Sequence, residues 1–171
     1  IPNSVTTIGE GAFYYCSSLK SIAIPSSINR ICKEAFSFCY NLTSITIPNS
    51  VKWIEEEAFS FCREVTSLTI GTGVISIGER AFNRCSSLKS ITIPNSVKWI
   101  EKNAFADCDA LASITIGTGV TSIGFWALCN YNHDIKITYK GTTQQWKNIE
   151  KNEPVCLDFI KVHCVDGDIY L

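Results

Sequence analysis

The sequence lacks the features that would indicate a highly charged or membrane-embedded partner. Its 171 residues carry a formal net charge of −1, and no run of basic residues occurs. No extended positive surface is therefore predicted to attract nucleic acid or acidic lipid. No stretch approaches the roughly 18 to 20 uncharged apolar residues of a membrane-spanning helix, and no basic start followed by a small-residue cleavage site marks a secretory signal within this sequence. We predict neither nucleic-acid binding nor membrane insertion.

Catalytic and metal-binding groups are equally sparse. The chain has two histidines, His133 and His163. His163 and Cys164 are adjacent, so on a strand their side chains point to opposite faces and cannot act together. No C-x-x-C pair of the kind that holds zinc occurs. The Gly-Thr-Gly stretches at 71–73 and 117–119 lack the Lys-Ser/Thr helix of a phosphate-binding loop, so we interpret them as turns. We expect no enzyme activity, no cofactor and no metal.

The sequence has instead a repeat of 23 residues, and six units follow one another without insertion. Each unit keeps its apolar positions while the others vary, as expected when one side of every coil faces a shared interior. Because one unit cannot bury both its faces, it becomes stable only by stacking on its neighbours. The units begin at residues Ile1, Ile24, Ile47, Ile70, Ile93 and Ile116.

Two apolar columns, two residues apart, predict one short strand in each unit. Six such strands at about 4.8 Å spacing form a parallel sheet about 25 to 30 Å across. Ala35, Phe36 and Cys39 have the spacing of one buried helical turn. A Pro-Asn-Ser or Gly-Thr-Gly turn follows each strand. The predicted fold is therefore an α/β repeat solenoid.

The nine cysteines divide into a regular column and four others. Stacked thiols that point the same way suit neither a tetrahedral metal site nor a disulfide, so we interpret the column as small buried packing groups. The odd total argues against a complete disulfide framework, although a bond between Cys156 and Cys164 remains open. The column consists of Cys16, Cys39, Cys62, Cys85 and Cys108, and Cys32 and Cys129 lie outside it with Cys156 and Cys164.

The phrase Leu-x-x-Ile-x-Ile joined to Ala-Phe-x-x-Cys, together with the IPNSV turn, resembles the BspA-like leucine-rich repeat family of bacterial and protozoan surface proteins. The resemblance covers residues 1–138. It implies a curved right-handed solenoid with its parallel sheet on the concave face. It also implies adhesion or protein recognition outside the cell or at its surface. The sixth unit departs from the pattern at Leu128, Tyr131 and Asp134, as terminal repeats often do.

Residues 139–171 are predicted to form a cap after the six repeats of residues 1–138. Thr142 to Gln145 has the pattern of a capping box before a short helix that carries Trp146 and Ile149 and is ended by Pro154. The pair Asp166-Gly167 predicts a hairpin between residues 160–164 and 169–171. This segment also resembles the terminal module found after BspA-like repeats. No equivalent cap precedes Ile1, so we expect missing upstream repeats or end-to-end self-association there.

Three sets of side chains are candidates for binding. Trp53 and Trp99 flank Ser76 and either form a slot or seal the neighbouring Gly-Thr-Gly units. Tyr15, Phe38 and Phe61 predict an aromatic strip at the border of the buried arc. The third set is a ladder of strand hydroxyls, which either pair across the sheet or form a polar platform for an extended chain. The ladder comprises Ser21, Ser44, Thr46, Ser67, Thr69, Ser90, Thr92, Ser113, Thr115 and Thr138.

We therefore predict a non-enzymatic module that binds a protein or other macromolecule, such as a host surface or matrix component. The alternative is a structural spacer without a specific ligand inside a larger surface protein. The two differ in whether replacement of the candidate residues weakens binding to a partner.

Overall fold

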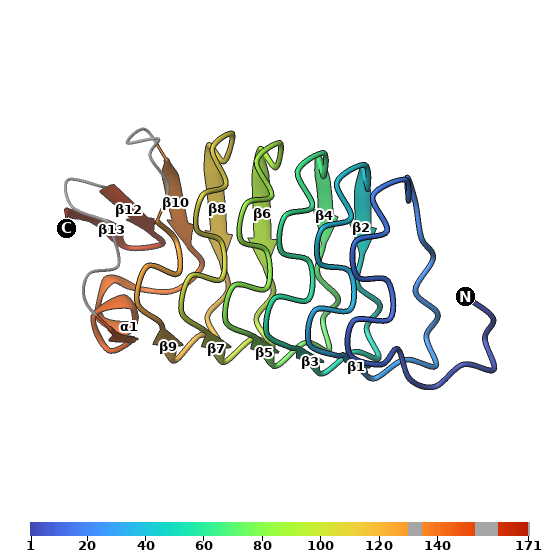
Figure 1. Ribbon diagram of the computed structural model, residues 1–171. Helices are drawn as coiled ribbons and strands as arrows, with labels where there is room; N and C mark the ends of the chain where they lie inside the picture. The colour runs from blue at the N-terminus through green and yellow to red at the C-terminus, as the bar shows by residue number, and fades with distance from the viewer. Residues whose placement is uncertain (130–134, 153–160, 171) are drawn as a thin grey trace.

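The chain winds into a β-solenoid whose coils stack along one axis (Figure 1). This computed structural model describes residues 1–129, 135–152 and 161–170. Each 23-residue unit from the second to the sixth contributes strands to two sides of the stack, and the first unit contributes only an isolated bridge from Ile8 to Ile31. The broad side contains β2 (Ser44–Thr46), β4 (Ser67–Thr69), β6 (Ser90–Ile93), β8 (Ser113–Ile116) and β10 (Lys136–Tyr139). All of these strands lie at the positions predicted from the apolar columns.

A second, narrow sheet was not predicted. Its strands hold two residues each, too few for a periodic signal, and they pair in parallel along the whole stack. In order, the strands are β1 (Arg30–Ile31), β3 (Trp53–Ile54), β5 (Ser76–Ile77), β7 (Trp99–Ile100), β9 (Ser122–Ile123) and β11 (Glu150–Lys151).

The core between the two sheets is continuous, because equivalent apolar side chains of successive coils stack on one another. This confirms the stacking prediction. Phe36 and Phe59 are fully buried, with their ring centroids 5.0 Å apart and their planes within 3°. The same stacking joins Phe59 to Phe82 at 5.4 Å and Phe82 to Phe105 at 5.3 Å. Each added coil therefore extends one aromatic stack and buries apolar surface on the coil before it.

The helical turn expected at Ala35, Phe36 and Cys39 does not form. Ser37 N–H donates to the Glu34 carbonyl within the coil, whereas Phe36 N–H donates to Ala58 of the next coil at 2.8 Å. Glu34 and Phe38 have left-handed backbone angles (φ 54° and 61°), which interrupt any helix. The segment is a series of tight turns tied sideways to its neighbours, a pattern that apolar spacing cannot distinguish from a helix.

The broad sheet is divided into two parts. Strand β4 pairs with β2, β6 pairs with β8, and β4 and β6 are not hydrogen-bonded to each other. We call this boundary the seam. The predicted unbroken six-stranded sheet is therefore wrong at this point, and residues 21–24 form no strand either.

Proline explains both interruptions. Beyond β8 and β10, Gly117 N–H donates to Ile93 and Lys140 N–H donates to Ile116, each at 2.9 Å, and these bonds close the ladder. The corresponding residue across the seam is Pro94, which has no N–H to donate. Pro48 holds the same place between residues 21–24 and β2, where pairing also fails.

Where proline interrupts pairing between coils, glycine instead allows neighbouring coils to approach closely. A Cβ on Gly73 would lie 1.8 Å from the Asn49 carbonyl oxygen, and one on Gly119 would lie 1.7 Å from that of Asn95. Only glycine permits this approach. The Gly-Thr-Gly stretches are thus turns, as predicted, and they also decide which coils pack most closely.

The closing segment continues both sheets rather than merely covering the stack. β11 extends the narrow sheet, and β12 (Lys161–Cys164) pairs in parallel with β10. β13 (Gly167–Tyr170) folds back antiparallel to β12, which is the predicted hairpin. The predicted capping box is also present, at the start of helix α1 (Thr143–Lys147), which buries Trp146 against Tyr139. The helix ends before Ile149, so the prediction that it carries this residue is wrong. α1 is the single α-helix in the described part of the chain.

The cysteine column is buried as packing material from Cys39 to Cys108. Cys16 is exposed because, among the described residues, coils lie against only one side of its own coil. Cys164 is a free thiol, which contradicts a bond between it and Cys156. Cys129 is disulfide-bonded, and nothing in its sequence spacing predicted this. The predictions for Tyr131, His133, Asp134, Pro154 and Cys156 concern residues outside the described ranges.

Candidate binding surfaces

The Ser/Thr ladder lies on the outer face of the broad sheet. Ser44 aligns with Ser67 and Thr46 with Thr69 in one part, and Ser90 aligns with Ser113 and Thr92 with Thr115 in the other. Most of these side chains are exposed, whereas Ser113 and Thr115 are half-buried. The seam separates Thr69 from Thr92, so the predicted continuous platform is two shorter ones.

Trp53 and Trp99 lie on the outer face of the narrow sheet, in register with Ser76 between them. Their exposed fractions are 40% and 45%, so both rings remain available to solvent. The Arg30 guanidinium lies 4.9 Å from the centre of the Trp53 ring and also forms an ion pair with Glu55 at 2.7 Å. Trp53 is thus held by a neighbour, and Trp99 is flanked by the small side chains of Ser76 and Ser122.

The predicted aromatic strip is part of a larger cluster. Phe38 stacks on Phe61 with centroids 4.6 Å apart, and Tyr15 lies 6.0 Å from Phe38. Two arginines extend the cluster, because Arg63 lies over Tyr40 at 5.2 Å and Arg84 lies over Phe61 at 5.0 Å. We call the whole set the aromatic–arginine surface: Tyr14, Tyr15, Phe38, Tyr40, Phe61, Arg63 and Arg84.

This surface was only partly predicted. The fifteenth position of units one to four holds Tyr15, Phe38, Phe61 and Arg84. A comparison of this position across the units that was not restricted to aromatic residues would have included Arg84. All four residues have left-handed backbone angles, with φ between 58° and 61°. Such angles cost a non-glycine residue about 1 to 2 kcal/mol. Similar angles recur at the eleventh position of the units, for example at Glu34, Arg80 and Trp126, so they are a property of the repeat and do not by themselves mark a binding surface.

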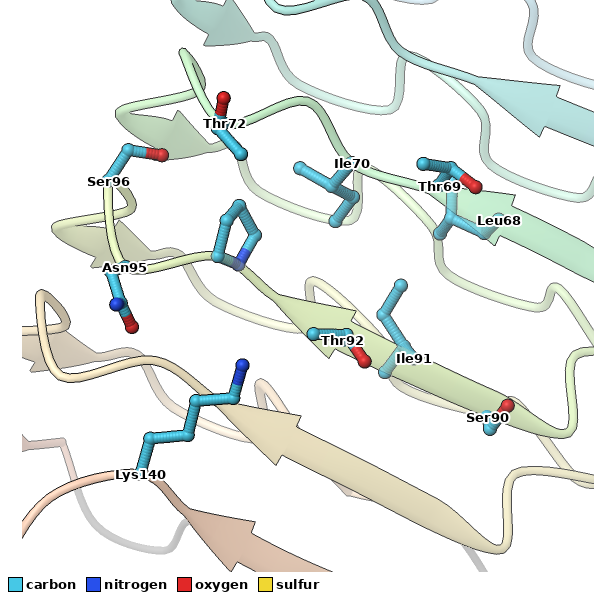
Figure 2. A pocket seen from close by; sticks show the side chains of 11 residues that line it. Leu68, Thr69, Ile70, Thr72, Ser90, Ile91, Thr92, Asn95, Ser96 and Lys140 are labelled. Carbon is cyan, nitrogen blue, oxygen red and sulfur yellow. The ribbon is translucent and has the colours of Figure 1, made fainter.

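A hollow of about 560 Å³ opens at the seam (Figure 2). Its apolar lining includes Leu68, Ile70 and Ile91, and Leu68 is half-buried although Ile45 and Ile114 at the same position are fully buried. Hydroxyl groups, the turn at 94–96 and the ammonium of Lys140 complete the lining. Spacing within one unit could not reveal this hollow, because it arises from two different coils that fail to pair.

A further set of polar side chains forms hydrogen bonds and ion pairs within the cap. Asp168 accepts hydrogen bonds from Lys161 at 2.6 Å and contacts His163 at 2.9 Å, and Asp166 accepts from the Thr143 backbone N–H at 2.7 Å. Within the described ranges, no three His, Cys, Asp or Glu residues come together as metal ligands. No helix in that part of the chain is long and apolar enough to cross a bilayer.

At the other end of the stack, Ile1, Val5, Phe13 and Ile22 line an apolar hollow of about 510 Å³. Phe13 stacks on Phe36 with one face only. Self-association at this end stays a prediction.

Stacked coils with a parallel sheet and a repeated Leu-x-x-Ile-x-Ile strand define a leucine-rich-repeat β-solenoid. The family model for the BspA type leucine rich repeat region matches residues 1–83 and 54–152, in six copies. The chain therefore belongs to the BspA-type leucine-rich repeat family, as the sequence resemblance indicated.

Three solved structures are similar to this chain. A leucine rich cell surface protein from Faecalibacterium prausnitzii is 31% identical with a TM-score of 0.71, covering 78% of this chain and 35% of that one. The leucine rich repeat protein of T. pallidum is 32% identical with a TM-score of 0.71, covering 75% and 60%. A leucine-rich repeat protein from Bacteroides ovatus, 24% identical with a TM-score of 0.65, covers 97% and 54% and shares the fold.

The chain thus spans about one to three fifths of the length of these structures. A search of curated proteins found no match. In general terms, membership of this family describes a surface or protein-interaction module built on a repeat scaffold.

Proposed function

We propose that the chain is a non-enzymatic protein-recognition module of a cell-surface or secreted protein, and that it binds its partner through the aromatic–arginine surface. The observation that carries this proposal is the gathering of the exposed Tyr14 and Tyr15 with further aromatic rings and Arg63 in one surface cluster. Tyrosine and arginine, like tryptophan, are enriched at binding hot spots.

The exposure and electrostatics of the surface support the same assignment. Tyr14 and Tyr15 are 48% and 60% exposed, which leaves two amphipathic rings for a partner to cover. Arg84 forms an ion pair with Asp107 at 3.2 Å, whereas Arg63 contacts only aromatic rings in the described ion-pair and cation–π contacts. The Arg63 guanidinium is therefore available to a carboxylate or carbonyl of a partner.

The experiment compares two matched sets of exposed aromatic residues. The chain is immobilised and screened by surface plasmon resonance against purified extracellular-matrix and cell-surface proteins. In the first variant Tyr14 and Tyr15 become serine and Arg63 becomes alanine. In the control variant Trp53 and Trp99 become serine, which removes equally exposed rings from the narrow sheet.

The first variant should weaken binding at least about tenfold per hot-spot residue while the control binds as the parent does. Both variants should retain the thermal unfolding transition of the parent. Loss of affinity in the control alone would move the site to the narrow sheet. A chain that binds none of the proteins, or binds equally with both variants, is better explained as a structural spacer.

A further inference from the structure

The seam differs from every other boundary between the described broad strands from β2 to β12, because two strand edges face each other there without hydrogen bonds. β4 uses its other edge to pair with β2, and β6 uses its other edge to pair with β8. The narrow sheet stays paired through β3, β5 and β7 at the same level of the stack. The coils are thus joined on one side and open on the other. Cα atoms of β4 and β6 still lie within 8 Å of each other, so the gap is too narrow for a further strand but leaves a hollow at the surface.

Ser96 gives independent support for the opening. In the third unit, the equivalent Ser50 hydroxyl donates to the Ile28 carbonyl of the preceding coil at 2.6 Å. The Ser96 hydroxyl is buried and makes no such bond, although it lines the hollow. Buried hydroxyls are nearly always hydrogen-bonded. The Ser96 oxygen is therefore a buried polar group without the bond that joins the equivalent serine to the preceding coil, which agrees with incomplete closure at the seam.

The lining of the hollow carries one positive charge. Lys140 is the one charged residue in its lining, and no described salt bridge involves this side chain. Lys140 directly follows β10, and its neighbour in the preceding coil is Gly117, which has no side chain to block its path. In Figure 2 the Lys140 ammonium points toward the turn that carries Asn95. A single uncompensated cation selects a ligand with a single negative charge.

The other lining groups narrow the class of ligand. Leu68 provides apolar contact, since Ile70 and Ile91 are buried, and Thr69 and Thr92 provide hydroxyls on either side. No carboxylate lines the hollow to hold a cation or an amine, and no aromatic ring lines it to stack on a sugar. The combination of one ammonium, hydroxyl donors and apolar contact matches the C-terminal end of a polypeptide.

We propose that the seam binds the C-terminal end of an extended peptide whose last side chain is apolar. The terminal carboxylate pairs with Lys140, and the last side chain covers the half-buried Leu68 beside the hydroxyls of Thr69 and Thr92. This site shares no residue with the aromatic–arginine surface. It is therefore independent of the proposed function above.

The first test uses five-residue peptides with an N-terminal fluorescein that end in Leu, Val or Phe. Each peptide is prepared with a free C-terminal carboxylate and as the C-terminal amide, and binding is followed by fluorescence anisotropy. The carboxylate form should bind at least about tenfold more tightly. Lys140→Gln should remove this preference. Lys136→Gln, which changes an exposed lysine on β10 outside the hollow, should keep it.

The second test probes the seam in the free and bound protein by hydrogen exchange. Segments 66–72 and 89–93 should exchange faster than segment 112–116, and they should become protected when the carboxylate peptide is added. Pro94→Gly places at this position the residue found at Gly71 and Gly117. It should slow exchange at the seam and abolish peptide binding.

The proposal is overturned if no carboxylate peptide binds better than its amide, or if Lys140→Gln and Lys136→Gln have the same effect. Equal exchange of segments 66–72 and 112–116 in the free protein would also overturn it, because the strand edges would then be paired.

Discussion

The Cys62 thiol donates a hydrogen bond to the carbonyl oxygen of Phe36 in the preceding coil, with the two atoms 3.3 Å apart. The same bond links Cys39 to Phe13, Cys85 to Phe59 and Cys108 to Phe82. The column is thus more than apolar filling, since each thiol also satisfies a buried backbone carbonyl. A small side chain with a weak donor fits this position, which explains why cysteine recurs there.

These contacts predict the reactivity of the thiols. Burial raises the pKa of Cys39 to about 11 and of Cys108 to about 12, and it raises the pKa of Cys85 as well. The thiolate is the reactive form, so these three residues should resist alkylation at pH 8. Cys16, which is exposed, should react first. Iodoacetamide labelling followed by peptide mass spectrometry checks this order, and rapid modification of Cys85 in the folded protein would contradict it.

Gly73 should tolerate no side chain. Its added Cβ would overlap the Asn49 carbonyl oxygen, so Gly73→Ala should lower the free energy of unfolding by about 3 kcal/mol or more. Gly9 provides the matched control, because nothing lies within 4 Å of an added Cβ there. Urea unfolding of the two variants measures the difference. Equal stability of Gly73→Ala and Gly9→Ala would show that the two coils do not approach as described.

Glu34 occupies a left-handed slot that Gly11 fills in the first unit, with φ of 54° and 61° respectively. Glu34→Gly should raise the free energy of unfolding by about 0.5 to 1 kcal/mol, because relief of the left-handed strain exceeds the added entropy of glycine in the unfolded chain. Gly11→Ala should have the opposite effect. Both are measurable by chemical denaturation, and a loss of stability in Glu34→Gly would contradict the backbone assignment.

The cap hairpin should lose stability in acid. The hydrogen bond from the Lys161 ammonium, followed by that from His163, lowers the pKa of the Asp168 carboxyl below its ordinary 3.8. A lowered pKa in the folded state stabilises the hairpin above pH 3.8, and this contribution disappears as pH falls through the folded value. The pKa of Lys161 is raised by the same hydrogen bond from its ordinary 10.5, so its contribution is complete below that pH and declines above it.

Asp168→Asn should therefore remove the extra acid sensitivity of β12 and β13. The measurement is amide hydrogen exchange of residues 161–170 at pH 5 and pH 2.5, after correction for the intrinsic pH dependence of exchange. If the parent and Asp168→Asn lose protection equally on acidification, the ion pair has no stabilising role.

Much of this architecture can be predicted from the chain because repetition makes weak signals add. The columns that contain Ile45, Phe36 and Cys39 recur at one period, and identical side chains at one period bury themselves only by stacking. The capping box at Thr142 and the Asp166-Gly167 turn are local patterns whose physics is complete within a few residues. Helix α1 and the hairpin are therefore found where they were expected.

The binding surfaces depend on relations that no single unit contains. Arg63 and Tyr40 belong to different units, and so do Arg84 and Phe61, so their contacts exist only once the coils are aligned. The Cys129 disulfide and the free thiol of Cys164 likewise depend on which parts of the chain meet in space. The narrow sheet, with two residues in each strand, has no period of its own to detect.

The 23-residue period, the stacked core and the cap follow from the amino-acid pattern alone, because each arises from burying the same apolar positions again and again. Only the assembled stack decides where the broad sheet opens. Pro94 has no N–H to donate to the neighbouring coil, whereas Gly71 and Gly117 let neighbouring coils approach closely. The effect of each residue depends on the groups that face it in the neighbouring coil. That pairing between coils, rather than any unit of the repeat, creates the hollow beside Lys140.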